Sequence, residues 1–438
     1  MLLIKLPAPS NLNLMIASVF NLILAPARLN AKEDGQALIC YNVAQGTKPP
    51  GTLNKQNGGI VPIMQGREKK FDLAVVGGGP AGSITAALAA EAGLTTAVLE
   101  QYKMPRFKTC GGFVSARALS LLPPDLDLDS VPGDPVFTLR IIKGNRSYDY
   151  RPSGRLGILV NREHYDQYLL RYAAKKGAEI LEEHTLQELI EPGASSGPPA
   201  YYHLESGEAA TSPIFSRYVV GADGAIGRTG VLSGLRKTGL SPCGRGLSEI
   251  VKTGNNQAYT GIEPGILKFF PLPGLGGMGW SFQGSGWINR GVGGLLGPGL
   301  LKKAYLQLFA GEKPGCGPSW WPLPFLGPLK KAGCKNLLLI GDAAGLVEPF
   351  SGEGLFNAFK SAILAVNAIK EAEESAMQAA DIYNRSYKNH FKKAFLPTIA
   401  GAAVLHSRGI LHPASMPGHM AGLMKNRLCF NRQFKPWT

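Results

Sequence analysis

The stretch Phe71-Asp-Leu-Ala-Val-Val-Gly-Gly-Gly-Pro-Ala-Gly82 decides the fold of this chain. Residues 71–76 are a nearly continuous apolar run rich in β-branched side chains, which is the pattern of a buried parallel strand. The pattern G-x-G-x-x-G follows at once, at Gly77, Gly79 and Gly82. A strand that runs directly into such a turn predicts the start of a dinucleotide-binding βαβ unit.

Each residue of this turn has a physical task. Gly77 permits the tight turn, Gly79 lets the backbone approach a pyrophosphate, and Gly82 permits close packing of helix on strand. The helix N-terminus that follows offers unpaired N–H groups and the positive end of its dipole to phosphates. Pro80 and Ala81, which lie within the turn, are expected to contact the cofactor as well.

The next residues complete the unit. Residues 83–92 are rich in alanine and predict a helix that ends at Gly93. Residues 95–99 predict a second strand, and Glu100 ends it at the spacing at which a carboxylate accepts hydrogen bonds from ribose hydroxyls.

A second glycine-rich element lies far downstream and distinguishes FAD from a nicotinamide cofactor. Residues 335–340 predict another buried strand, which ends at Gly341 and Asp342, and Gly352 and Gly354 precede a further helix. Asp342 can accept from a polyol hydroxyl, and the N–H groups of the glycine-rich turn can stabilise the negative charge of a reduced flavin. A nicotinamide enzyme has no need of this element, so we expect FAD.

Composition limits the class of protein. The chain has 438 residues, of which 45% are hydrophobic and 18% charged, and this excludes a disordered protein. The six cysteines form no CxxC pair, so no metal site is expected, and a reducing, cytoplasmic compartment fits best.

The net charge of +15 suggests an anionic partner. Residues 376–438 hold nine basic residues and one acidic residue, and aromatic residues are too sparse there for nucleic acid. Peripheral contact with a membrane and a helical cap with a solvated face are the two alternatives.

Several motifs now resemble those of the geranylgeranyl reductase family, within the p-hydroxybenzoate-hydroxylase-like flavoproteins. Beside the glycine-rich elements, Ala222-Asp223-Gly224 marks the superfamily. The narrower family is indicated by Pro105-Arg-Phe-Lys-Thr-Cys-Gly-Gly112, by residues 348–354 and by Arg162 with Tyr165-Asp166. The resemblance covers about residues 70–372 and implies an FAD-dependent oxidoreductase that saturates isoprenoid double bonds.

Two segments depart from the family pattern. Met278 and Gln283 stand where the substrate-domain stretch G-Y-x-W-x-F-P has its Tyr and Pro. Gly227 and Arg228 follow Asp223 where the family often has S-x-x-R.

The resemblance and the composition together imply a fold and a set of sites. The expected fold class is α/β, with a Rossmann-like FAD-binding domain interrupted by a mostly antiparallel β-sheet substrate domain and followed by a C-terminal helical segment. The expected parts are a disordered leader at 1–68, an FAD-binding domain at 69–115, 155–240 and 333–375, a substrate domain at 116–154 and 241–332, and a basic helical segment at 376–438.

The candidate site residues fall into a catalytic, a cofactor-binding and a substrate-binding group. Cys110 is the candidate catalytic residue, with a small residue in a tight turn as the alternative. Arg106 and Lys108 can neutralise FAD phosphates or the reduced flavin. The full cofactor set is Gly77, Gly79, Pro80, Ala81, Gly82, Glu100, Arg106, Lys108, Cys110, Gly111, Gly112, Arg162, Asp223, Gly341, Asp342, Gly352 and Gly354. Phe269, Trp280 and Phe282 are candidates for the wall of an apolar substrate pocket.

Three functions are weighed. A reductase of an apolar, isoprenoid-like small molecule is favoured, and a flavin-dependent monooxygenase or halogenase is the alternative. A non-catalytic flavoprotein is the third. The electron donor is left open between NADPH, ferredoxin and quinol.

Overall fold

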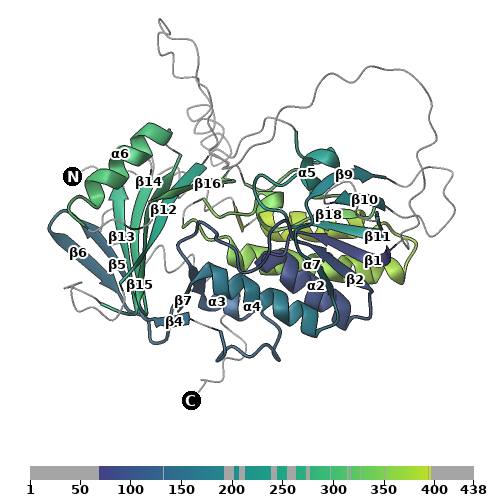
Figure 1. Cartoon of the computed structure of the whole chain (residues 1–438), viewed down its shortest axis with the longest axis horizontal. Helices are drawn as coiled ribbons and strands as arrows, with labels where there is room; N and C mark the ends of the chain where they lie inside the picture. Colours follow the sequence, from purple (N-terminus) through teal and green to yellow (C-terminus); the bar gives the residue numbers. More distant parts are fainter. Residues whose placement is uncertain are drawn as a thin grey trace, which may run out of the picture. The chain divides into compact units, whose positions relative to one another are not determined.

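A largely parallel sheet forms around the first expected strand. The computed structural model describes residues 69–131, 133–191, 202–206, 213–237, 244–253, 263–272, 277–295, 297–312, 315, 317–325, 327–349, 351–392 and 394–395. Within them this sheet consists of β1 (Lys69–Val76), β2 (Thr96–Leu99), β8 (Glu179–Leu181), β9 (Leu186–Ile190), β10 (Tyr202–Ser206), β11 (Ile214–Gly221), β17 (Gly333–Cys334) and β18 (Leu337–Leu339). Strand β1 lies between β2 and β11 and is parallel to both, and β8 and β18 extend the parallel part (Figure 1). The carboxyl ends of β1, β2, β11 and β18 therefore meet at one edge.

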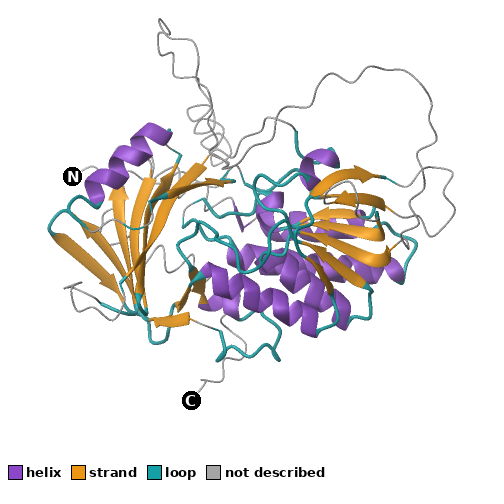
Figure 2. Cartoon of the chain, viewed as in Figure 1, coloured by secondary structure: helices purple, strands orange, loops and turns teal. Residues whose placement is uncertain are grey.

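Helices cover this sheet. They are α2 (Pro80–Glu91), α3 (Ala116–Leu119), α4 (Arg162–Lys175), α5 (Thr229–Leu232), the 3₁₀ turn η2 (Gly341–Ala344), α7 (Leu355–Glu373), α8 (Ala379–Tyr387) and the π-helical turn η3 (Lys388–Lys392). Helix α2 packs against both α4 and α7, and these three lie together along the parallel sheet in Figure 2.

Two boundaries differ from the sequence expectation. Helix α2 begins at Pro80 rather than at residue 83, because the fixed φ of proline suits the first helical position. The strand expected at 335–340 is confined to Leu337–Leu339. Lys335 instead has a positive φ of 53° and turns the chain back, so that β17 and β18 pair as an antiparallel hairpin.

A second sheet is mostly antiparallel. Its strands, in order across the sheet, are β16 (Ser319–Leu323), β12 (Gly244–Lys252), β15 (Trp287–Gly294), β14 (Gly277–Gly284), β13 (Ile266–Leu272), β5 (Thr138–Lys143) and β6 (Arg146–Tyr150). Only the β13–β5 pair of this sheet is parallel. A small sheet of β3 (Phe113–Ser115), β7 (Gly157–Val160) and β4 (Gly133–Val136) packs beside β14.

Helix α6 (Pro298–Leu308) covers the outer face of the seven-stranded sheet. Leu301 and Tyr305 of the helix share an apolar cluster with Leu247 of β12. Beneath them Glu249 forms a buried ion pair with Arg290 at 2.7 Å and accepts a hydrogen bond from Tyr305. The other face of the sheet is thus the one left to line a cavity.

The expected α/β fold class is confirmed, with a parallel sheet, an interrupting antiparallel sheet and C-terminal helices. The domain boundaries stay a prediction. The expected leader at 1–68 and most of the basic segment at 376–438 lie outside the described residues. Among the helices that the structure describes, none combines the length and the apolar character needed to cross a membrane.

Candidate functional site

A cavity of about 540 Å³ lies between the carboxyl edge of the parallel sheet and the inner face of the seven-stranded sheet. Nearly all of the expected site residues line it. These are Gly77, Gly79, Pro80, Ala81, Glu100, Arg106, Lys108, Cys110, Gly111, Gly112, Arg162, Asp223, Asp342, Gly352 and Gly354 from the cofactor set, and Phe269, Trp280 and Phe282 from the substrate set. Gly82 and Gly341 do not line it and lie just behind, in contact with Gly77 and Ala81 respectively.

The glycine-rich turn has the shape that a dinucleotide needs. Gly77 has a φ of 106°, and a Cβ on Gly82 would lie 1.9 Å from the carbonyl oxygen of Gly77. Any side chain at Gly82 would therefore push α2 away from β1. A Cβ on Gly79 would meet only the end of Arg106, at 3.4 Å, so the backbone is open on the cavity side. No side chain caps the N-terminus of α2, which leaves its first N–H groups for a ligand.

Glu100 and its neighbours form a buried charge network beside this turn. Glu100 is 3% exposed and accepts hydrogen bonds from the backbone N–H groups of Gly78 and Tyr102, at 2.9 Å and 3.0 Å. Arg106 lies between carboxylates, 3.4 Å from Glu100 and 3.3 Å from Asp166. Arg106 therefore already has protein partners, and its role toward FAD stays a prediction.

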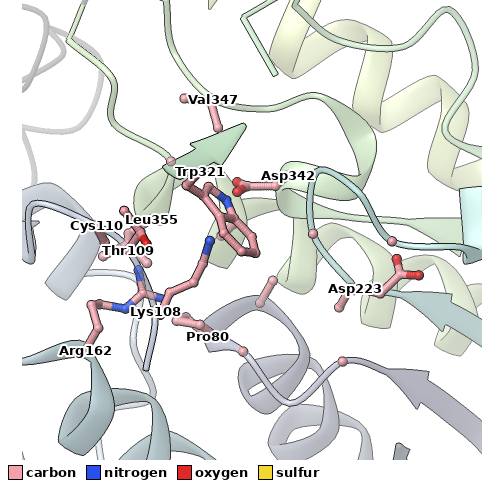
Figure 3. A pocket seen from close by; sticks show the side chains of 18 of the residues that line it. Pro80, Lys108, Thr109, Cys110, Arg162, Asp223, Trp321, Asp342, Val347 and Leu355 are labelled. Carbon is pink, nitrogen blue, oxygen red and sulfur yellow. The ribbon is translucent and has the colours of Figure 1, made fainter. Parts of the chain in front are cut away.

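Lys108 is one of the cations that line the cavity. Its ammonium lies over the ring of Trp321, 3.1 Å from the ring centroid, and Figure 3 shows it beside Arg162 and Asp342. Burial lowers the pKa of Lys108 to about 7, although Asp342 opposes this shift. An amine with a pKa this low responds strongly to any anion placed beside it.

Cys110 is held by contacts on both sides. Its Sγ accepts from the backbone N–H of Gly112 at 3.4 Å and from the side chain of Arg162. Burial lowers the pKa of Arg162, but Asp166, which it contacts at 2.7 Å, and Cys110 outweigh burial and raise it overall. The carbonyl of Cys110 accepts from Asn289 at 2.6 Å. Whether the thiol takes part in the chemistry stays a prediction.

Asp223 carries an unsatisfied acceptor. Its Oδ2 accepts from the backbone N–H and the hydroxyl of Thr229, both at 2.8 Å. Its Oδ1 is buried and has no hydrogen-bond partner. Burial raises the pKa of Asp223, while Thr229 opposes the shift. An orphaned acceptor on a residue that lines the cavity fits a hydroxyl-bearing cofactor, because an unmet buried acceptor is costly.

The loop before α7 is held by contacts with α3 and by contacts within the loop. Glu353 pairs with Arg117 and accepts from the hydroxyl of Ser115 at the start of α3. Glu348 accepts from the backbone N–H of Ser351 at 2.7 Å. These contacts hold Gly352 against the cavity with a φ of 73°.

The unobstructed turn at Gly79, the uncapped N-terminus of α2 and the buried Oδ1 of Asp223 without a hydrogen-bond partner together fit FAD.

Aromatic side chains form the wall opposite the glycine-rich turn. Phe282 lies edge to face with Phe269, with ring centroids 5.1 Å apart, and 6.4 Å from the ring of Trp280. Met278 and Gln283, the two departures from the family stretch, do not line the cavity. Their replacement therefore leaves the described wall intact.

Two residues of this site were not among those expected from the sequence. Trp321, which received no role, lines the cavity from β16 and contacts Lys108. Asn289, which was not considered, connects Trp280 to Cys110. Strand alternation could have found Asn289, because it lies opposite Phe282 on the neighbouring strand and so shares its face.

Comparisons with known proteins find an FAD-binding domain and named reductases. Residues 70–245 match the family described as FAD binding domain. The chain is 30% identical to a digeranylgeranylglycerophospholipid reductase of Methanopyrus kandleri, over 75% of this chain and 88% of that protein. It is 28% identical to the chloroplastic geranylgeranyl diphosphate reductase of Nicotiana tabacum, over 77% of this chain and 74% of that protein. The crystal structure of a geranylgeranyl bacteriochlorophyll reductase-like protein of Thermoplasma acidophilum shares the fold, with a TM-score of 0.65, 23% identity, and coverage of 82% of this chain and 92% of that one.

Proposed function

Because the chain belongs to the geranylgeranyl reductase family of FAD-dependent oxidoreductases, we propose that it saturates carbon–carbon double bonds of a polyprenyl compound. The observation that carries this proposal is that one cavity is lined both by the glycine-rich turn and by the wall of Phe269, Trp280 and Phe282. A polyprenyl chain offers only apolar surface and alkenes, so an aromatic wall suits it. Relatives named for geranylgeranyl compounds support the same substrate class.

Some residues around the cavity would bind the cofactor, and others would hold the substrate. When bound, FAD supplies the hydride for the alkene. Gly77, Gly79 and the start of α2 hold the pyrophosphate, and Asp342 holds a hydroxyl of the chain between phosphate and ring. The aromatic wall excludes water and holds the alkene in place, which raises the rate by orientation. Cys110 faces the same space and is the candidate that positions the alkene or delivers the proton.

Anaerobic product analysis tests the proposal. The FAD-loaded protein, reduced with dithionite, is mixed with geranylgeranyl diphosphate or with a geranylgeranylated glycerol lipid, and products are followed by mass spectrometry. We expect a gain of two hydrogen atoms for each saturated bond, together with reoxidation of the flavin. In a parallel sample exposed to air, insertion of an oxygen atom into an added aromatic compound, with no saturated polyprenyl product in the anaerobic sample, would instead establish a monooxygenase.

Two adjacent tryptophans provide a matched pair for the substrate wall. Trp321 lines the cavity, whereas Trp320, its neighbour on β16, is 41% exposed and does not line it. We expect Trp321→Ala to slow reduction of the polyprenyl compound and Trp320→Ala to leave it unchanged. Equal effects of the two substitutions would place the substrate elsewhere.

The same system tests NADPH, reduced ferredoxin and a quinol as the electron donor. Each replaces dithionite in turn, and the rate of flavin reduction is recorded without substrate.

A further inference from the structure

Asn289 joins the aromatic wall to the segment that carries Cys110. It lies on β15, is 3% exposed and does not line the cavity itself. Its Oδ1 accepts a hydrogen bond from the indole N–H of Trp280 at 2.8 Å. Its Nδ2 donates to the carbonyl oxygen of Cys110 at 2.6 Å. One buried amide therefore connects a strand of the seven-stranded sheet with the loop that precedes β3.

The two partners fix the orientation of this amide. An indole N–H can only donate and a backbone carbonyl can only accept, so the oxygen of Asn289 must face Trp280 and its nitrogen must face Cys110. Asparagine supplies the acceptor and the donor at once. An ionised aspartate of the same shape has no donor, and it would place a negative oxygen against the carbonyl of Cys110.

The backbone beside Cys110 is in close contact with the wall. A Cβ on Gly111 would lie 2.9 Å from the ring of Phe282, which shows that the chain lies directly on this ring. The carbonyl of Gly112 accepts from the backbone N–H of Val160 at 2.8 Å, which anchors the segment to β7. Arg162 contacts the thiol of Cys110 from the α4 side. The hydrogen bond from Asn289 to the carbonyl of Cys110 thus ties the Cys110 segment to the seven-stranded sheet.

We propose that Asn289 is a positioning residue, which sets where Cys110 lies relative to Trp280 and thereby the space in which the substrate is held. The part of this inference that concerns the substrate rests on the proposed function. The part that concerns Cys110 does not, because the position of the thiol can be measured without substrate. Loss of the amide leaves Trp280 and Cys110 free to shift independently of each other.

Alkylation of Cys110 with iodoacetamide, read as the modified peptide by mass spectrometry, measures how well the segment is held. Loss of one hydrogen bond should increase opening of the segment, and hence the alkylation rate, about five- to tenfold. We expect this increase for Asn289→Leu at every pH. For Asn289→Asp we expect it near neutral pH, with a return toward the wild-type rate as the pH falls, because a protonated carboxyl again offers one acceptor and one donor.

Asn384→Asp is the matched control. Asn384 of α8 also bonds backbone groups with both amide atoms: it accepts from Ala332 and donates to the carbonyl of Gly333 at 2.9 Å. This variant should lower thermal stability and leave Cys110 alkylation at the wild-type rate. Each rate is divided by the wild-type rate at the same pH, which removes the pH dependence that all variants share. Arg162, the charged group in contact with Cys110, is paired with Asp166 in the wild type.

The outcomes separate the two proposals. The positioning role is overturned if the alkylation rate of Asn289→Asp, divided by the wild-type rate, does not change with pH. It is also overturned if Asn384→Asp raises the alkylation rate as much as Asn289→Asp does. Restored alkylation protection at low pH supports it, and recovery of polyprenyl reduction by Asn289→Asp over the same range extends it to the substrate. If alkylation behaves as expected and no polyprenyl compound is reduced by the wild type, the proposed function fails and the positioning role stands.

Discussion

Lys108 makes FAD affinity depend on pH, and the size of the effect can be worked out from its surroundings. Its ammonium lies over the ring of Trp321 in the cavity wall, and desolvation there lowers its pKa to about 7, with Arg162 adding to the shift and Asp342 opposing it. The FAD pyrophosphate is an anion placed in the same cavity, which favours the charged amine. We therefore predict that binding of FAD is coupled to uptake of a proton by Lys108.

The sign of the effect follows from which state binds the proton. In the free protein Lys108 loses its charge as the pH rises through about 7, whereas in the complex it keeps the charge. Affinity for FAD should therefore fall as the pH rises. From about pH 7 to about pH 9 the charged fraction in the free protein drops from about one half to about one hundredth, which corresponds to an affinity about fiftyfold weaker, or about 2.3 kcal/mol.

Unfolding of the protein without FAD should show the opposite trend. The unfolded chain keeps the proton on Lys108 up to its ordinary pKa of 10.5, whereas the folded protein gives it up above about 7. Between these values the unfolded state binds more protons, so stability should rise with pH. The two opposite slopes, stability rising and FAD affinity falling, would share one residue as their cause.

Titration of the apoprotein with FAD, followed by quenching of flavin fluorescence, measures the affinity across this range. Calorimetry in two buffers of different ionisation enthalpy measures the proton uptake directly. Lys108→Gln should bind FAD with an affinity that changes little with pH, and it should lose the slope in stability as well. Lys302→Gln, on the exposed face of α6, is the control that should follow the wild type. A wild-type affinity that is constant with pH, or an unchanged slope in Lys108→Gln, would refute the reasoning.

Three further substitutions test other parts of the structure. Gly82→Ala should give a purified protein without the flavin absorbance band and with a lower melting temperature, because its Cβ would lie 1.9 Å from a backbone oxygen. Glu249→Gln should lower the free energy of unfolding in urea by about 2–4 kcal/mol, because it removes the charge facing the buried Arg290, with flavin content unchanged. Gly111→Ala should retain FAD and slow single-turnover reduction about tenfold or more, because the new Cβ would lie 2.9 Å from Phe282 and displace the wall.

The cofactor half of the site could be predicted because its determinants are local in sequence. The turn at Gly77 and Gly82 depends on backbone conformation within one βαβ unit, and the residue types that allow it are few. Asp223 and Asp342 follow apolar strands, and parallel strands bring their carboxyl ends to one edge. The fold class follows from the same pattern of strands and turns.

The start of α2 and the β17–β18 hairpin were harder to predict. Proline at residue 80 is compatible with a turn and with a first helical position, and only tertiary packing selects between them. Lys335 has a positive φ, which could not be predicted from the sequence because lysine seldom adopts such a conformation.

The substrate half could be predicted only in part, because its contacts join residues far apart in the chain. Phe269, Trp280 and Phe282 were expected as a wall from their aromatic character, and the structure places all three at the cavity. Strand alternation can place Asn289 on the same face as Phe282, but nothing in the sequence shows that its two amide atoms bond an indole and a distant carbonyl.

The positions that shape the substrate space therefore differ in kind from those that hold the cofactor. A change at Gly82 acts through a steric overlap with backbone and leaves no alternative conformation, so loss of FAD should be complete. A change at Asn289 removes one hydrogen bond between two otherwise well-packed surfaces, so the fold and the cofactor should persist while Cys110 moves. If relatives with different substrates retain the glycine-rich turn, their specificity should be sought in residues like Asn289 and Trp321, which connect the two halves without touching the dinucleotide turn.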